Sequence, residues 1–168
     1  MTLPSNLKPY EIYPIAVRAE MDAAAVYEDL HGRVRNEALK QKLDFLAKEE
    51  GRHKALLERL FRDHFPDRKL DVPAEARRPK KPVRVDDATA VLDLFKLAMQ
   101  KEKEAEEYYR DARAKMDDPK TKKVLEYLSR VERSHFFMLK SEIALLEKFP
   151  DYYNAESDDP MALFHVGP

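Results

Sequence analysis

Two segments decide the fold: LDFLAKEEGRH at residues 43–53 and LEYLSRVERSH at residues 125–135. They lie 82 positions apart, and in each one Leu, Leu, Glu and His follow one another by steps of three, four and three residues. That spacing places all four side chains on one face of a helix. The acidic residue and the histidine therefore lie on the apolar face, in these two pairs: Glu50 with His53, and Glu132 with His135.

The same shift of 82 positions relates two upstream segments. Glu20 and Tyr27 recur as Glu102 and Tyr109, and each pair lies on a stripe of apolar residues with helical spacing. Each half of the chain is therefore predicted to form two helices. Asn36 and the pair Asp118–Pro119 precede the second helix of each half, where an N-cap and a first-turn proline are favoured.

The repeat predicts the organisation of residues 1–168 as a single domain. We expect a first hairpin at about 10–65, a linker at 66–86, a second hairpin at about 87–149 and a tail at 150–168. Four prolines (Pro66, Pro73, Pro79 and Pro82) oppose a helix in the linker. Two antiparallel helical hairpins joined by a long crossover make an all-α, ferritin-like four-helix bundle.

Composition excludes several classes of protein. The chain has no Cys, so disulfides and thiolate-bound clusters are excluded. Its formal net charge of -1 gives no reason to expect a nucleic acid or an anionic membrane as partner. The basic linker residues are interpreted as solvated because no aromatic residue is interleaved with them: Arg77, Arg78, Lys80, Lys81 and Arg84. No stretch has the length of a signal peptide core or a membrane span, and we expect a cytoplasmic protein.

The charged residues on the core face point to metal binding. Four carboxylates in one bundle would repel each other and cost several kcal/mol per buried ion unless cations compensate. Two divalent ions balance four carboxylates, and the histidines can bind as neutral imidazoles. A mixed oxygen and nitrogen ligand set favours iron, with manganese possible. The expected metal ligands are Glu20, Glu50, His53, Glu102, Glu132 and His135.

Less specific interpretations remain. The bundle could be metal-free with fortuitous buried polar residues, and Tyr27 and Tyr109 could be ordinary core residues rather than hydrogen-bond donors to ligand carboxylates. The other histidines have no repeat partner and are interpreted as non-ligands: His31, His64 and His165.

The chain resembles the rubrerythrin-like branch of the ferritin-like superfamily. The matching segments are AVRAEMDAAAVY (16–27), FLAKEEGRH (45–53), LAMQKEKEAEEYY (97–109) and YLSRVERSH (127–135), within about residues 10–149. The resemblance implies that Glu50 and Glu132 bridge two irons. It also implies that Glu20 and Glu102 are terminal ligands, that His53 and His135 each serve one iron, and that Tyr27 and Tyr109 support the carboxylates.

Two departures from this family matter. Rubrerythrins proper carry a rubredoxin domain with four cysteines, and this chain has no cysteine. An external electron donor, rubredoxin-like or a flavin protein, is therefore expected. Rubrerythrins also carry a further Glu where this chain has Ala105. Glu106 is adjacent but is turned by about 100 degrees around the helix.

Three functions follow as hypotheses. The first is a di-iron peroxidase or oxidase that reduces hydrogen peroxide or dioxygen in oxidative-stress defence, with Glu50, Glu132, Tyr27 and Tyr109 as its catalytic residues. The second is a ferroxidase that handles iron. The third is a helical scaffold in which the metal is only a structural staple. A homodimer is expected by analogy, with Phe136, Phe137 and the aromatic tail as interface candidates.

Overall fold

The computed structural model describes residues 7–74 and 88–151 and contains four long helices within them. They are α1 (Pro9–Arg33), α2 (Glu37–His64), α3 (Ala88–Lys115) and α4 (Pro119–Lys148). The predicted N-caps are confirmed. The side chain of Asn36 accepts a hydrogen bond from the backbone N–H of Leu39 at 3.0 Å, and Asp118 accepts one from Thr121 at 2.6 Å.

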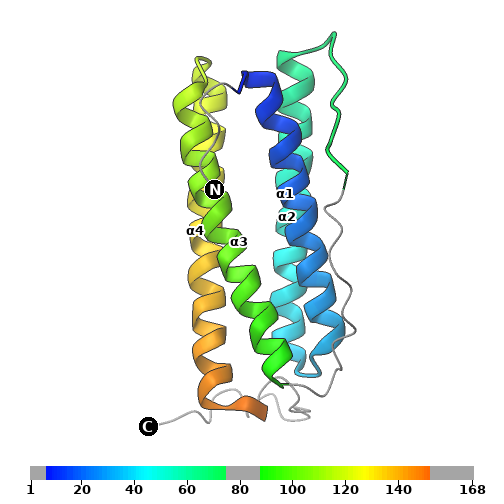
Figure 1. Cartoon of the computed structure of the whole chain (residues 1–168), viewed down its shortest axis with the longest axis vertical. Coiled ribbons are helices and arrows are strands. Elements are labelled where there is room, and N and C mark those ends of the chain that lie inside the picture. The colour runs from blue at the N-terminus through cyan, green and yellow to red at the C-terminus, as the bar shows by residue number, and fades with distance from the viewer. Residues whose placement is uncertain (1–6, 75–87, 152–168) are drawn as a thin grey trace.

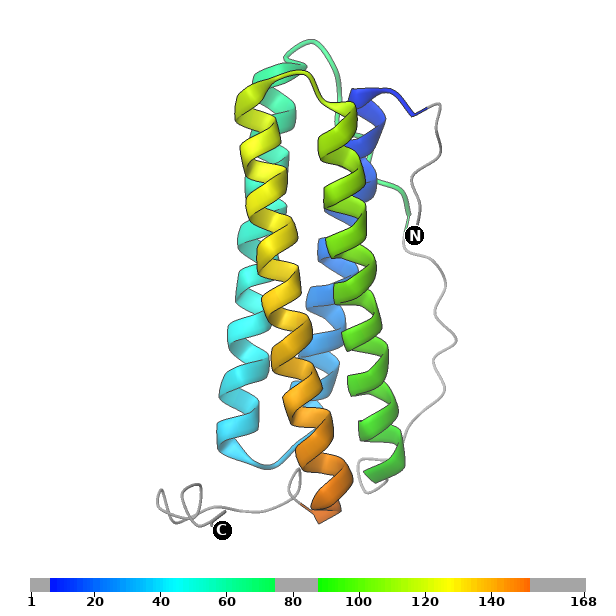
Figure 2. The same ribbon diagram turned by 90° about the vertical axis from the view of Figure 1, so that its left-hand side faces the viewer.

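The helices form the predicted all-α, ferritin-like bundle. Helix α1 packs mainly on α2 and α3 mainly on α4, while the two hairpins meet chiefly through α1 and α3. Figures 1 and 2 show all four helices aligned along the long axis of the molecule, with α3 beginning at the end opposite to the one where α2 stops. Helices α1 and α3 therefore run antiparallel, which is the arrangement that an internal repeat with twofold symmetry produces.

The apolar core is divided into two clusters. One contains Leu30, Leu43 and Phe95, and the other contains Tyr13, Leu57 and Leu125. The predicted ligand residues lie along the helices between these clusters, since Glu50 and His53 fall between Leu46 and Leu57 on α2. The bundle therefore has apolar layers at both ends and a polar layer between them.

The first part of the linker packs back on the first hairpin. Leu70 and Val72 contact the cluster that contains Leu57, and the guanidinium of Arg68 lies 4.0 Å from the centre of the Tyr10 ring. Figure 1 shows this segment running beside the hairpin of α1 and α2.

The basic residues at 77–84, most of the tail and His165 lie outside the described residues. Among the described residues, none of the helices combines the length and apolarity that a membrane span requires.

Candidate metal centre

Each helix contributes one Glu to the polar layer, and helical spacing places a Tyr or a His of the same helix on the same face. All of these side chains are buried, with exposed fractions of 2% or less. They are Glu20 and Tyr27 on α1, Glu50 and His53 on α2, Glu102 and Tyr109 on α3, and Glu132 and His135 on α4.

The six predicted ligands form two groups that overlap. In each group one ligand atom per residue lies within 4.8 Å of all the others. The first group is Glu20, Glu50, His53 and Glu132, and the second is Glu50, Glu102, Glu132 and His135. Glu50 and Glu132 belong to both groups, so the two groups are adjacent and share two carboxylates.

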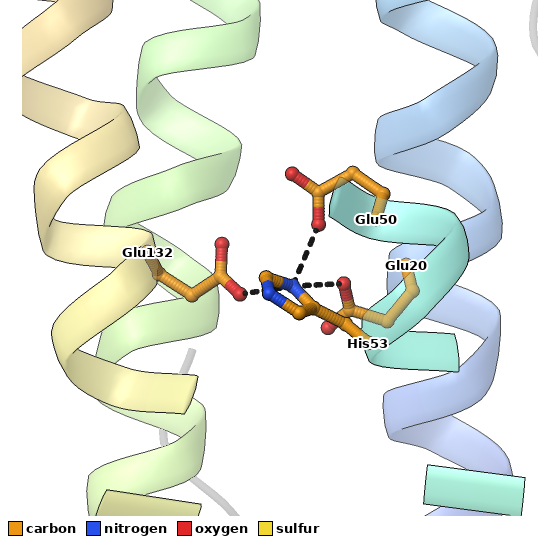
Figure 3. Close-up of side chains that lie close together, drawn as sticks. All are labelled: Glu20, Glu50, His53 and Glu132. Carbon is orange, nitrogen blue, oxygen red and sulfur yellow. Dashed lines mark hydrogen bonds and ion pairs between the residues drawn. The ribbon is translucent and has the colours of Figure 1, made fainter. Parts of the chain in front are cut away.

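Distances around His53 define the first group. Its Nδ1 lies 3.1 Å from an oxygen of Glu50, 3.1 Å from one of Glu132 and 3.4 Å from one of Glu20. Figure 3 shows the imidazole between these carboxylates, with Glu132 reaching across from the opposite hairpin. Ligand atoms about 90 degrees apart in an octahedral sphere of about 2.1 Å lie about 3.0 Å from one another. The first group therefore has the spacing of a coordination sphere.

The second group repeats this geometry. Nδ1 of His135 lies 3.1 Å from Glu50, 3.4 Å from Glu132 and 3.5 Å from Glu102. The two imidazole rings lie nearly parallel, 19° apart, with centroids separated by 5.8 Å. The two groups are thus related by the approximate twofold symmetry of the repeat.

The tyrosines cross between the hairpins. The hydroxyl of Tyr27 on α1 donates a hydrogen bond to Glu102 on α3, and that of Tyr109 on α3 donates one to Glu20 on α1. The predicted hydrogen bond to a carboxylate of the candidate site is present for both residues. In each case the partner belongs to the other half of the repeat, so each hydroxyl fixes a carboxylate of the opposite group.

Unpartnered buried atoms indicate that the cluster fits a metal. Oε1 of Glu50, Oε1 of Glu132 and Nδ1 of His135 are buried and make no hydrogen bond. Glu50 Oε1 and His135 Nδ1 even lie 3.1 Å apart without forming one. Buried polar atoms are normally hydrogen-bonded. Several oxygen and nitrogen atoms that face one another without hydrogen bonds are typical of metal ligands directed at a common ion. The residues present therefore fit a metal site.

Without metal, the layer balances its charge through shifted pKa values. Burial raises the pKa of Glu20 and Glu102 well above the usual range of a carboxyl, and the charge of Glu132 adds to this effect. Burial also disfavours charge on Glu132, but its contacts with His135 and His53 outweigh burial and lower its pKa to about 2. Burial lowers the pKa of His135, whereas contacts with Glu102, Glu132 and Glu50 raise it to about 12. The directions of these shifts favour protons on the imidazoles, Glu20 and Glu102 when no metal is bound.

Other sequence candidates lie outside the two groups. His31 is exposed, whereas His64 links the hairpins through Nε2, which is 3.2 Å from both Asp118 and Thr121. Glu106 is in neither group, and its backbone carbonyl accepts a hydrogen bond from Ser129. Ala105 lines a cleft of about 410 Å³ between α1 and α3, which also reaches carboxylates of both groups. Sequence reasoning did not predict this cleft.

Comparison with known proteins places the chain in a family. The family model described as Rubrerythrin matches residues 11–143. A hypothetical protein from Pyrococcus furiosus shares 31% sequence identity, with a TM-score of 0.78 over 86% of this chain and 94% of that one. No curated protein matches.

A second solved structure shows the same fold at lower identity. It is a bacterioferritin from Rhodobacter capsulatus, determined with a metal-free dinuclear site and a haem iron, and it is 20% identical. Its TM-score is 0.70 over 95% of this chain and 99% of that one. Since the family model spans most of the sequence and both hairpins, the chain belongs to the rubrerythrin family.

Proposed function

We propose that this protein is a non-haem di-iron oxidoreductase that reduces hydrogen peroxide, or dioxygen, in oxidative-stress defence. The observation that carries the proposal is the pair of overlapping ligand groups that share Glu50 and Glu132. These shared carboxylates would hold two metal ions close together, as redox chemistry on a peroxide requires. Membership of the rubrerythrin family supports this reading.

The donor set supports iron as the metal, with manganese as the alternative. Four carboxylates and two imidazoles combine hard oxygen ligands with nitrogen ligands, whereas structural zinc sites are mostly built from Cys and His. In this assignment Glu50 and Glu132 would be shared by two ions, Glu20 and Glu102 would each bind one ion, and His53 and His135 would complete the two groups.

When bound, the metal pair supplies two electrons and holds the oxidant. The protein contributes position and exclusion of water. Tyr27 and Tyr109 hold the carboxylates of Glu102 and Glu20 by hydrogen bonds, which limits the rotation of both ligands. The two apolar clusters keep bulk water from the ends of the layer.

The cycle needs electrons from outside these residues. The 168 residues contain no cysteine and thus no thiolate-bound iron, so a separate rubredoxin-like or flavin protein is the proposed donor.

We place the protein in the cytoplasm and expect a homodimer. The exposed Phe137, whose ring packs edge-on against Phe136 at 5.4 Å, supports an interface on α4.

The deciding experiment is stopped-flow oxidation of the Fe2+-loaded protein, prepared without oxygen. Hydrogen peroxide and dioxygen are compared at equal concentration, followed by a second series with excess Fe2+. The proposal expects the faster reaction with peroxide. A faster reaction with dioxygen that continues through the excess Fe2+ would assign the protein to iron handling, and no reaction with either oxidant would leave a structural metal site.

A further inference from the structure

The cleft between α1 and α3 opens onto the predicted metal ligands. It has a volume of about 410 Å³ and is lined by Glu20, Glu50, Glu102 and Glu132 at its inner end. Most of its other lining residues are repeat partners, 82 positions apart: Ile15 with Leu97, Ala19 with Lys101, Asp22 with Glu104, Ala23 with Ala105, and Val26 with Tyr108. The cleft therefore lies on the symmetry axis that relates the two ligand groups.

The walls of the cleft are apolar. Ala23 and Ala105 each lie one turn after a terminal carboxylate, and their small side chains leave the space that a larger residue would fill. The hydroxyl of Tyr108 donates a hydrogen bond of 2.7 Å to the carbonyl of Ile12. Because this hydroxyl is satisfied, Tyr108 contributes its ring as a further apolar surface.

The outer residues of the cleft carry charges that cancel. Arg18 pairs with Asp22 at 2.5 Å, and Lys101 pairs with Glu104 at 2.9 Å. These side chains are 18% to 48% exposed, whereas Glu20 and Glu102 below them are 2% exposed. Because these four outer residues carry no net charge, they do not concentrate ions of either sign at the cleft entrance. The entrance therefore suits an uncharged molecule.

The volume is far larger than hydrogen peroxide requires. One water occupies roughly 30 Å³ in the liquid, so the cleft could hold on the order of ten molecules of that size. The cleft volume falls instead within the range of sites that bind small organic molecules, roughly 300–1,000 Å³. Apolar walls and polar groups at one end are typical of such sites.

We propose that the cleft binds organic hydroperoxides. The apolar substituent lies against Ala23, Ala105 and Leu97, and the hydroperoxide group faces the carboxylates at the inner end. This assignment rests on the proposed function and names a substrate class for it. The O–O bond of ROOH breaks, two electrons from the external donor and two protons are taken up, and ROH and water are formed.

Turnover by the iron-loaded protein tests the substrate class. With an excess of reduced donor, kcat/KM is measured for cumene hydroperoxide and for hydrogen peroxide. The variant Ala105→Leu fills the cleft, and Ala144→Leu makes the same change at an exposed position of α4. We expect Ala105→Leu to lower the ratio of kcat/KM for cumene hydroperoxide to that for hydrogen peroxide at least tenfold, while Ala144→Leu leaves the ratio unchanged.

Binding of cumyl alcohol, the product, gives a second measurement that does not need turnover. By isothermal titration calorimetry we expect binding to the iron-loaded wild type and to Ala144→Leu, and at least tenfold weaker binding to Ala105→Leu. Circular dichroism checks the fold of each variant, and Ala23→Leu, the repeat partner, replaces Ala105→Leu if that variant does not fold.

The outcomes separate this proposal from the proposed function. Hydrogen peroxide turnover without cumene hydroperoxide turnover or cumyl alcohol binding overturns the organic substrate and leaves the peroxidase standing. An unchanged kcat/KM ratio in both cleft variants overturns it as well. If neither peroxide is turned over, the proposed function fails, and the substrate assignment fails with it even if cumyl alcohol binds.

Discussion

Tyr27 and Glu102 lie in different hairpins, 75 residues apart in the sequence, and are joined by a buried hydrogen bond. The bond ties a phenol of α1 to a predicted ligand on α3. Its symmetric equivalent joins Tyr109 to Glu20. The two bonds connect the hairpins at the polar layer and at the same time orient one carboxylate in each ligand group.

Replacing Tyr27 with Phe should weaken metal binding by 10- to 100-fold, the range typical of lost outer-shell partners. The carboxylate of Glu102 would gain freedom to rotate and would lose a hydrogen bond that favours its bound orientation. Competition with a chelator of known affinity measures the change. Tyr127→Phe is the matched control because Tyr127 is 53% exposed on α4.

The symmetry of the site adds a condition to this prediction. Tyr109→Phe should have an effect close to that of Tyr27→Phe, since the two hydroxyls make equivalent contacts. If both variants bind metal as tightly as the wild type and as Tyr127→Phe, the hydroxyls do not position the ligands.

Removing either shared carboxylate should abolish binding of a second metal ion. Glu50→Ala and Glu132→Ala each take one ligand from both groups, whereas the other four residues belong to only one group. Metal content per chain after gel filtration, measured by mass spectrometry, should fall from two ions to at most one. Glu49→Ala, one position earlier and outside both groups, should retain two.

A retained pair of ions in both Glu50→Ala and Glu132→Ala would show that the assignment of shared ligands is wrong. Loss of both ions in Glu49→Ala would show instead that the effect is not specific to the cluster. Far-ultraviolet circular dichroism of each variant separates a lost ligand from a lost fold.

The 82-residue repeat was sufficient to predict the bundle and the residues of the polar layer. Spacing of three and four residues fixes which side chains share a helix face, and Asn36 and Asp118 mark two helix starts by local hydrogen bonding. These features depend on residues close in sequence, which is why the sequence alone reveals them.

Features that depend on packing between the hairpins were not predictable in the same way. Tyr27 lies seven residues after Glu20, about 10.5 Å along the helix, so it cannot reach that carboxylate and bonds to Glu102 instead. Which carboxylate it reaches is set by how α1 and α3 face each other. The cleft at Ala23 and Ala105 likewise exists only once these two helices are placed side by side.

Chelation should destabilise the protein without unfolding it. Apolar clusters lie at both ends of the polar layer, and they remain when the ions are removed. We expect helical circular dichroism at 25 °C to be retained after treatment with a chelator, with a lower Tm. Loss of the helical signal on chelation would support the metal-staple hypothesis, in which binding and folding are one transition.

Stability of the metal-free protein should fall as pH rises from 6 to 8.5. The pKa values of His53 and His135 are raised in the folded protein. Their contribution to the free energy of unfolding is therefore complete below pH 6.5, the ordinary pKa of histidine, and declines as the pH rises above it. Glu20 and Glu102 also have raised pKa values, so their ionisation opposes folding above the ordinary value of 4.5. The pKa of Glu132 is lowered to about 2, so this residue stabilises the fold above pH 4.5, the ordinary pKa of a Glu. That stabilisation is lost only as the pH falls toward 2 and has no effect on the interval from 6 to 8.5.

The Tm of chelator-treated protein measured by calorimetry checks this pH dependence. Bound metal replaces the protons, so the rise in Tm on adding metal should grow over the same pH interval. The variant His31→Ala, at an exposed histidine outside the cluster, should behave like the wild type. A metal-free Tm that is constant or rises between pH 6 and 8.5 would contradict the internal charge balance.

Metal binding at pH 7 should also release protons. Because contacts with the surrounding carboxylates raise the pKa values of His53 and His135, both imidazoles carry a proton that a metal must displace. Protonated Glu20 and Glu102 would add to the number released. Calorimetric titration with Mn2+ in two buffers of different ionisation enthalpy counts these protons, and we expect at least two per pair of ions. Release of fewer than one proton would mean that the imidazoles are neutral before metal binds, and that the carboxylates of the empty site are balanced in another way.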